Sequence, residues 1–282
     1  MSLEIELSAV VVTVKDNDAC VLCLSLAPGP GPAYALPSGP FLPHNHRTFD
    51  LALRAFVQDQ TGFNIGYVEQ LYSFGDDGRQ ALLADLSTGI RAISVGYLAL
   101  TPSSDFTARI KAAWVPFERF FPWEDWRAPG GNVALDKLRP ALDAWCHRMA
   151  GDEFTLRQRR VETLFPHDFS HWNEERVLDR YELLYDAGLV AEAIDATDTP
   201  ASSSGALKHS EAGAPMASDH RRIVATGLSR LRGKLKYRPI IFELMPEMFT
   251  LLDLQRSLEA ISGIRLHKQN FRRSLELSLI HI

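Results

Sequence analysis

A cluster of polar and basic residues near the end of the chain has the side-chain types and spacing that suit contacts with nucleic acid. Its members are His267, Lys268, Gln269, Asn270, Arg272 and Arg273. Gln and Asn can hydrogen-bond adenine edges, and Arg and Lys can bind guanine edges or phosphates. Such side chains read bases when they lie at the start of a helix that enters the major groove. We therefore expect a base-reading helix to begin near Lys268, with Phe271 turned into the core.

A second helix and a turn must hold that helix in place. Thr250 is a suitable N-cap for the segment LLDLQRSLEA, Asp253 can complete part of a capping box, and Gly263 suits the turn. Leu251, Leu254 and Leu258 are expected to face inward. The segment therefore predicts a helix-turn-helix.

Basic residues are concentrated in the same part of the chain. Residues 221–276 hold 12 Lys and Arg against 5 Asp and Glu, so they carry a net +7, and the remainder carries −12. A basic module on an acidic body is typical of nucleic-acid binding, although a solvated basic helix face remains an alternative. Leucine spacing favours a helix over residues 221–236, and Lys234, Lys236 and Arg238 are candidate phosphate contacts.

The first half of the chain has the pattern of a mixed sheet. Apolar runs at residues 5–14 and 19–26 predict a hairpin, and further strands are expected at 67–74 and 93–101. Thr48 and Gly62 suit the two ends of a helix between these strands. Helical patterns then extend from about residue 131 to 191. Strands followed by helices predict an α+β fold.

Composition limits the remaining possibilities. The longest apolar runs are too short to span a membrane, mean hydropathy is −0.10, and the N-terminus lacks signal-peptide features, so a cytoplasmic location is expected. Cys20 and Cys23 form a C-x-x-C without a second pair, which argues against a zinc site. No metal or required cofactor is predicted.

The segment LRGKLKYRPIIFELMPEMFTLLDLQRSLEAISGIRLHKQNFRR resembles the winged-helix domain of the Nudix-related transcriptional regulators of NAD metabolism, the NrtR type and its relative NadQ. LPSG at 36–39, LALRAFVQDQTGF at 51–63, LYSFGDDGR at 71–79 and AISVGYLAL at 92–100 resemble the Nudix-like domain of that family. The resemblance implies an N-terminal Nudix-like α/β/α sandwich, a helical middle segment and a C-terminal winged helix-turn-helix. The expected divisions are 1–145 (Nudix-like sensor), 146–193 (helical segment), 194–219 (disordered linker), 220–276 (DNA-binding domain) and 277–282.

The Nudix-like helix lacks the residues that hydrolysis requires. A Nudix hydrolase needs the pattern R-E-U-x-E-E-x-G, because carboxylates on one helix face hold the Mg²⁺ ions. Residues 55–62 correspond to that pattern, and they place Phe56 and Gln60 where glutamates are expected. Asp59 is the one carboxylate that remains in the glutamate pair. We therefore expect the fold to be kept and hydrolysis to be lost.

The resemblance implies that the sensor binds an adenine nucleotide such as ADP-ribose, NAD or ATP. Arginines that pair with phosphate and aromatic rings that stack on adenine are the relevant residue types. The candidate pocket residues are Gly39, Phe41, Arg54, Phe74, Arg79 and Arg91. The family further implies a repressor that binds a palindromic operator in double-stranded DNA as a homodimer, because two-fold protein symmetry matches two half-sites.

The last six residues, LSLIHI at 277–282, do not continue the family pattern, which runs into a β-hairpin wing. They match a translated transposon end used in sequencing libraries, so a sequence artefact at a truncated end, with the wing missing, is expected. Two other interpretations of the chain compete with a repressor. One is an active Nudix pyrophosphatase with an accessory DNA-binding domain, and the other is a module that binds protein partners through its basic helix.

Overall fold

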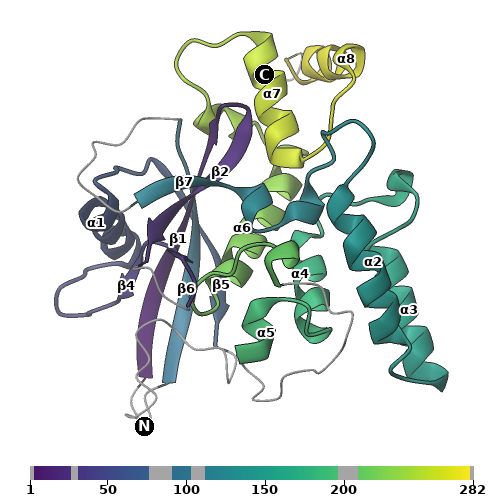
Figure 1. The fold of residues 1–282 in the computed structure, drawn as a ribbon. Helices are drawn as coiled ribbons and strands as arrows, with labels where there is room; N and C mark the ends of the chain where they lie inside the picture. Colours follow the sequence, from purple (N-terminus) through teal and green to yellow (C-terminus); the bar gives the residue numbers. More distant parts are fainter. Residues whose placement is uncertain (1–2, 27–30, 76–90, 103–111, 196–208, 280–282) are drawn as a thin grey trace.

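A mixed seven-stranded sheet lies at the centre of the computed structural model, which describes residues 3–26, 31–75, 91–102, 112–195 and 209–279 (Figure 1). The order along the sheet is β3-β2-β1-β6-β5, with β4 also paired to β1 and β7 to β2. Strands β1 and β6 are parallel, and the other pairs are antiparallel. The strands are β1 (Leu3–Lys15), β2 (Asp18–Ser25), β3 (Tyr34–Ala35), β4 (Ser38–Pro40), β5 (Tyr67–Phe74), β6 (Arg91–Leu100) and β7 (Ala112–Pro116).

Strand β1 separates two hydrophobic layers because its side chains alternate between the faces of the sheet. Leu7, Ala9 and Val11 belong to the cluster that packs against α1. Val10 and Val12 belong to the larger cluster on the opposite face, which includes α6. The sheet therefore sits between helices, as the expected sandwich requires.

The helices cover the sheet and extend beyond it (Figure 1). Helix α1 lies on one face and α6 on the other, while α2 and α3 stand to one side and α7 and α8 lie at one end of the molecule. The helices are α1 (Phe49–Thr61), α2 (Val133–Cys146), α3 (Gly151–Leu164), α4 (Val177–Asp186), α5 (Ala191–Asp195), α6 (His220–Leu235), α7 (Leu251–Ser262) and α8 (Lys268–Leu279), with 3₁₀ turns η2 (Phe117–Arg119), η3 (Pro122–Glu124), η4 (Phe169–His171), η5 (His209–Ala212) and η6 (Ile240–Leu244).

Local sequence signals account for the ends of several elements. The β1–β2 hairpin turns at Asp16 and Asn17, both with positive φ, as a tight primed turn requires. Thr48 caps α1 and Gly62 ends it in the left-handed conformation, so both expected boundaries are confirmed. The helix expected over 221–236 is confirmed as α6.

Helix α6 packs on the sheet although the sequence placed it with the DNA-binding domain. Its apolar face is buried, and a Cβ on Gly227 would lie only 3.0 Å from the Val10 side chain. At its start, the Leu36 N–H donates to Nδ1 of the buried His220 at 2.8 Å. The helix is thus part of the core around the sheet and leads from there towards α7.

The described part of the expected disordered linker is folded, which corrects that expectation. Residues 209–219 begin with η5, and Ala212 and Met216 are buried. The Ala217 N–H donates to the Tyr34 carbonyl at 2.9 Å, and Met216 forms a β-bridge with Tyr34. Composition missed this segment because its few apolar residues are buried against distant parts of the chain. Residues 196–208 lie outside the described part of the structure.

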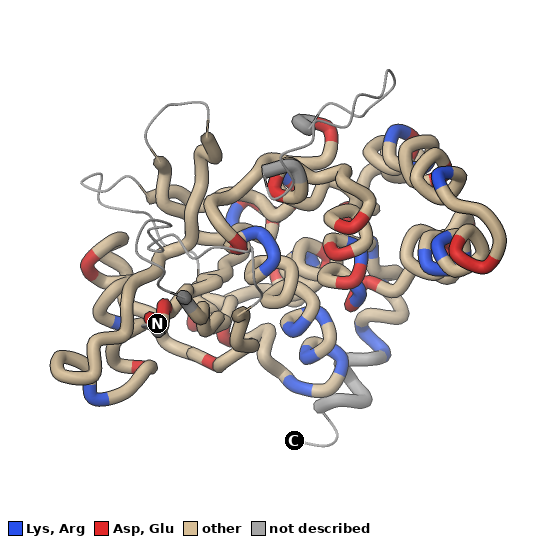
Figure 2. The backbone as a smooth tube through the Cα atoms, turned by 90° about the horizontal axis from the view of Figure 1, so that it is seen from below, with Lys and Arg blue, Asp and Glu red and all other residues tan. Residues whose placement is uncertain are grey.

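Charged residues of both signs lie near one another at several places along the backbone, separated by longer uncharged stretches (Figure 2).

Within the described ranges, none of the helices combines the length and apolar composition needed to cross a bilayer. The same residues contain no group of three or more His, Cys, Asp and Glu side chains arranged to hold a metal ion.

Candidate nucleic-acid interface and sensor site

Helices α7 and α8 form the helix-turn-helix expected from the sequence. Thr250 and Asp253 form a complete capping box at the start of α7, and Gly263 ends the helix with a φ of 72°. Helix α8 then begins at Lys268, one residue after His267, the first member of the polar cluster. Leu254 is buried and Leu258 is partly buried, but Leu251 is 55% exposed, so its expected inward position is wrong.

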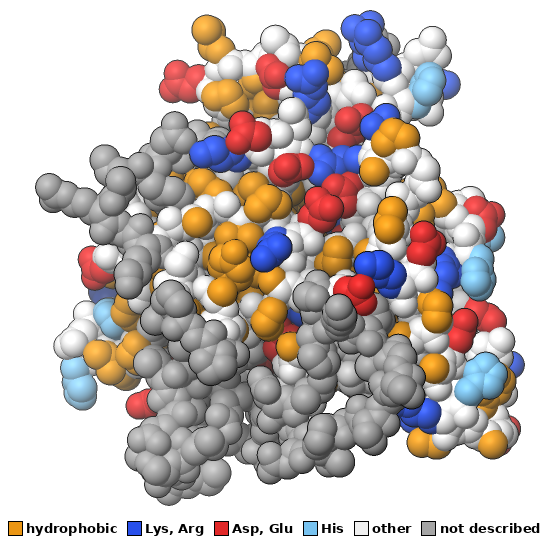
Figure 3. All heavy atoms as spheres, in the orientation of Figure 1, with side chains coloured by type: hydrophobic (Ala, Val, Ile, Leu, Met, Phe, Trp, Pro, Cys, Tyr) orange, Lys and Arg blue, Asp and Glu red, His pale blue; other side chains and the backbone are white. Residues whose placement is uncertain are grey.

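The start of α8 presents its polar side chains to solvent. Phe271 is only 7% exposed and joins the core, as expected. Basic side chains stand out on the surface over this end of the molecule (Figure 3). The exposed residues are Lys268, Gln269, Asn270, Arg272 and Arg273. These side chains therefore share a solvent-accessible helix start.

The helix-turn-helix is attached to the sensor by a buried ion cluster centred on Glu124, which we call the Glu124 cluster. Its carboxylate is 3% exposed and binds Arg180 through two bonds of 2.6 and 2.9 Å. It also binds Arg232 of α6 at 2.6 Å. Burial lowers the pKa of Arg232, while the carboxylate of Glu124 favours its charged form.

The Glu124 cluster reaches the turn between α7 and α8. Arg232 Nε donates to the Ile261 carbonyl at 2.8 Å, and the Trp126 N–H donates to the Gly263 carbonyl at 2.7 Å. A Cβ on Gly263 would collide with the Glu124 carbonyl oxygen. The turn between α7 and α8 is therefore docked on the rest of the fold.

On the α1 face, aromatic rings pack around Phe56, the residue at the position of the first glutamate in the hydrolase pattern. A Cβ on Gly39 would lie 2.8 Å from the Phe56 ring, so only glycine allows that ring its position. Phe56 packs edge-on against His46 at 5.2 Å between ring centroids, and Phe41 packs against Phe49 at 4.5 Å.

Gln60 serves as a link between α1 and β4. Its Oε1 accepts from the Ser38 N–H at 3.0 Å, and its Nε2 donates to the Ser38 carbonyl at 2.6 Å. An amide can make both bonds, whereas a carboxylate can only accept. Asp59 is exposed on the same helix. The geometry therefore uses residue 60 for structure.

The predicted pocket residues do not converge on one described site. Arg54 pairs with Asp50 at 2.9 Å and donates to the Ile65 and Gly66 carbonyls, so its guanidinium holds the loop after α1. The other members lie on different faces of the sheet. Gly39 and Phe41 lie on the α1 face, whereas Phe74 packs on the α6 face beside Arg222. The Arg91 backbone pairs with Leu3, and Arg79 lies outside the described residues.

Two of the three predicted phosphate contacts on the α6 segment are held in ion pairs. Lys234 binds Glu69 of β5, and Lys236 binds Glu174 at 3.0 Å and Glu175 at 2.6 Å. These pairs compete with any phosphate. Arg238 is exposed, and its N–H donates to the Lys234 carbonyl at 2.9 Å, which extends the helical path of α6.

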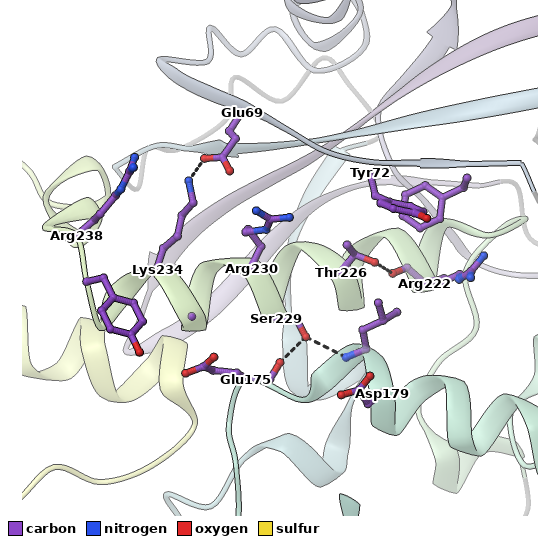
Figure 4. A pocket seen from close by; sticks show the side chains of 14 residues that line it. Glu69, Tyr72, Glu175, Asp179, Arg222, Thr226, Ser229, Arg230, Lys234 and Arg238 are labelled. Carbon is purple, nitrogen blue, oxygen red and sulfur yellow. Dashed lines mark hydrogen bonds and ion pairs between the residues drawn. The ribbon is translucent and has the colours of Figure 1, made fainter.

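The sequence did not predict the groove that lies beside α6 (Figure 4). Arg230 and Lys234 lie four residues apart on α6, Arg222 lies eight residues before Arg230, and Arg238 follows four residues after Lys234, beyond the end of the helix. This spacing was the available signal, but the alternation of basic residues from 230 to 236 obscured it. Glu124 and its partners gave no signal, because they lie far apart in the sequence.

Comparison with known proteins places these features in context. Residues 241–280 match the family model of the NrtR DNA-binding winged helix domain. That match extends four residues beyond the boundary expected at 276. A stretch of 60 residues is 38% identical to the "ADPR responsive transcriptional repressor NtrR" of Acinetobacter baylyi. It covers 21% of this chain and about a quarter (24%) of that protein.

The fold extends the likeness over almost the whole chain. The crystal structure of Shewanella oneidensis NrtR matches with a TM-score of 0.54 and 17% identity, covering 97% of this chain and 83% of that one. A MutT/nudix family protein from Enterococcus faecalis matches with a TM-score of 0.55 and 14% identity, covering 98% and 82%. At such identities the likeness concerns the fold. In its C-terminal residues and in its fold the chain is therefore NrtR-like, joining a Nudix-like domain to an NrtR-type winged helix domain.

Proposed function

We propose that the chain is a transcriptional repressor that binds DNA through α7 and α8 and releases it in response to an adenine nucleotide, with ADP-ribose as the leading effector. The observation that carries this proposal is the exposed polar start of α8, held on a capped helix-turn-helix that matches the NrtR DNA-binding family. The relative from Acinetobacter baylyi, named as ADPR responsive, supports the choice of effector.

In this proposal the first turn of α8 reads the bases. Gln269 and Asn270 suit adenine edges. Lys268, Arg272 and Arg273 suit guanine edges or phosphates. The solved structure of Shewanella oneidensis NrtR with a 27mer DNA has the same fold, at a TM-score of 0.53 and 17% identity. Thr250 serves the reader indirectly, since its hydroxyl caps α7.

The repressor would act as a homodimer on a palindromic operator in genes of NAD biosynthesis or salvage. A two-fold dimer presents two recognition helices to two half-sites, which suits a palindrome. It would work in the compartment that holds its DNA, the cytoplasm of a bacterial cell.

The sensor would bind its effector without hydrolysing it. Phe56, at the position of the first motif glutamate, packs its ring against Gly39, and the Gln60 amide is committed to Ser38. These contacts disfavour the alternative, an active pyrophosphatase. An ADP-ribose hydrolysis assay with Mg²⁺ separates the two functions, because measurable turnover by the purified chain would support the enzyme.

Replacement of Arg272 and Arg273 by alanine tests the reader. We expect the double variant to fold normally and to lose specific binding to a palindromic fragment from upstream of its own gene in a mobility-shift assay. The matched control is Arg148→Ala, an exposed arginine near the end of α2. Equal affinity of the double variant and the control would refute the assignment of α8.

A further inference from the structure

The groove beside α6 has the size and position of a ligand site. It encloses a volume of about 1060 Å³ between β5, α4 and α6. Known small-molecule sites have volumes of about 300–1,000 Å³, so the groove can take a ligand as large as a dinucleotide. Figure 4 shows Arg230, Lys234 and Arg238 extending from α6 and the segment after it towards the β5 side of this groove.

The basic residues in the groove form a stripe that Thr226 interrupts at one position. Residues four apart lie on the same side of a helix, each about 6 Å further along its axis. Arg222, Arg230, Lys234 and Arg238 follow this interval, with Thr226 in the position between the first two. Helix α6 therefore presents its cations in a row along the wall of the groove.

Two of these cations lack an ion-pair partner among the described residues, although the charge of Arg230 also acts on the carboxylate of Glu69. The carboxylates that line the groove are already paired: Glu69 with Lys234, Glu175 with Lys236, and Asp179 with Arg176. Arg222 is paired with Glu182 at 2.6 Å. Arg230 and Arg238 have no ion pair with any residue in the described ranges. The groove thus has two guanidinium groups available for an anion.

Aromatic rings lie near both ends of the stripe. Tyr72 is 62% exposed and contacts Phe74 at 5.5 Å between ring centroids, beside Arg222. Tyr237 is 83% exposed and precedes Arg238. Exposed aromatic faces of this kind can stack on a base.

The described residues of the α1 face include fewer free groups that could bind a phosphate than the α6 groove does. The space on the α1 face is filled by the rings of Phe41, Phe49 and Phe56, and its predicted cation, Arg54, is engaged by Asp50 and backbone carbonyls. Phosphate groups need cations or free N–H donors, and apolar rings supply neither. Within the described residues, the groove along α6 and the segment after it brings two arginines without an ion pair, Arg230 and Arg238, into one pocket.

We propose that the α6 groove binds a nucleoside-diphosphate ligand, with Arg230 and Arg238 on the diphosphate and Tyr72 or Tyr237 on the base. This proposal rests on the proposed function, because it locates the effector site of the repressor. Arg238 and Tyr237 belong to the segment that joins α6 to η6 and so to the helix-turn-helix. A ligand held there would contact the sensor and the connection to the reader at once.

Calorimetric titration of the full chain with ADP-ribose, inorganic pyrophosphate and adenosine tests the site. The test variant is Arg230→Gln with Arg238→Gln, and the control is Arg148→Gln, which removes an exposed arginine outside the groove. Thermal unfolding and circular dichroism establish that the variants are folded. We expect wild type and control to bind ADP-ribose and pyrophosphate, and the double variant to bind both at least about tenfold more weakly, since each lost contact is a charge-assisted hydrogen bond.

Two results would overturn the groove as the site: wild-type affinity for ADP-ribose in the double variant, or binding of neither phosphate compound by the wild type. A mobility-shift assay tests the location of the ligand site separately from the proposed function as a repressor. If ADP-ribose releases DNA from the wild type and from the double variant at the same concentration, the repressor stands and the groove is wrong. If it releases DNA from neither, while the groove binds ADP-ribose, the groove stands and the proposed response is wrong.

Discussion

Replacement of Glu124 by glutamine removes one negative charge from a buried site and leaves Arg180 and Arg232 facing each other. Both arginines are almost fully buried and both bind this carboxylate. Removing one partner of a buried ion pair costs about 3–5 kcal/mol, because the remaining charge is neither solvated nor paired. Here two cations are left, so we expect a loss of unfolding free energy at the upper end of that range.

The expected loss is a large share of the stability of a typical protein, which is about 5–15 kcal/mol. In a chain of this size it corresponds to a fall in the unfolding midpoint on the order of 10 °C. Urea unfolding followed by tryptophan fluorescence suits the measurement, since the guanidinium of Arg180 stacks on Trp172 at 4.0 Å.

The matched control is Glu153→Gln. This carboxylate is 53% exposed and pairs with Arg157 at 3.0 Å one helical turn away. Exposed pairs of this type contribute about 0.3–0.5 kcal/mol, so the control should unfold almost like wild type. If Glu124→Gln lost less than about 1 kcal/mol, the view that the cluster docks the helix-turn-helix would be refuted.

Three further predictions concern other parts of the molecule. Gln60→Glu should lower the unfolding free energy by about 1–3 kcal/mol, because a carboxylate cannot donate to the Ser38 carbonyl. The variant should not restore ADP-ribose hydrolysis, and an active variant would contradict the role given to this amide. His220 has its pKa lowered by burial from 6.5 to about 4, so it stays neutral in the folded chain while the unfolded chain takes up a proton. Stability should therefore be complete above pH 6.5 and fall by about 3 kcal/mol as the pH drops to 4, and urea midpoints for wild type and His220→Gln across that range should differ in slope. Gly263→Ala should reduce both the thermal midpoint and operator affinity, because alanine resists a φ of 72° and its Cβ would collide with a backbone carbonyl; unchanged DNA binding would argue against docking of the turn.

Elements with local signals could be predicted from the sequence. Thr48 and Gly62 bound α1, and Thr250 and Gly263 bound α7, because caps depend on residues within one or two turns. The β1–β2 hairpin was predictable for the same reason, since its two strands are joined by a tight turn. The start of α8 at Lys268 also followed from residue types at helical spacing, while its contact with bases stays a prediction.

Features that depend on distant contacts could not be predicted. Glu124 and Arg232 are 108 residues apart, and Leu36 and His220 are 184 apart. Composition made residues 209–219 resemble a linker, although Met216 is buried beside Tyr34. The candidate pocket residues were chosen by resemblance, whereas the groove that brings Arg230 and Arg238 together is formed by β5, α4 and α6. In each case the deciding partner comes from another part of the fold.

The docked turn has a consequence for how such a protein could let go of DNA. Since Gly263 is bonded to Trp126 and packs against Glu124, a rigid connection there would make α8 and its own sheet domain a single body. In a two-fold dimer, the distance between the two recognition helices is then set by how the two bodies meet. Half-sites on B-DNA are about 34–36 Å apart, so a small rotation between the bodies would spoil the fit at both half-sites together. Induction would then change the span between two rigid readers and leave the shape of each reader unaltered.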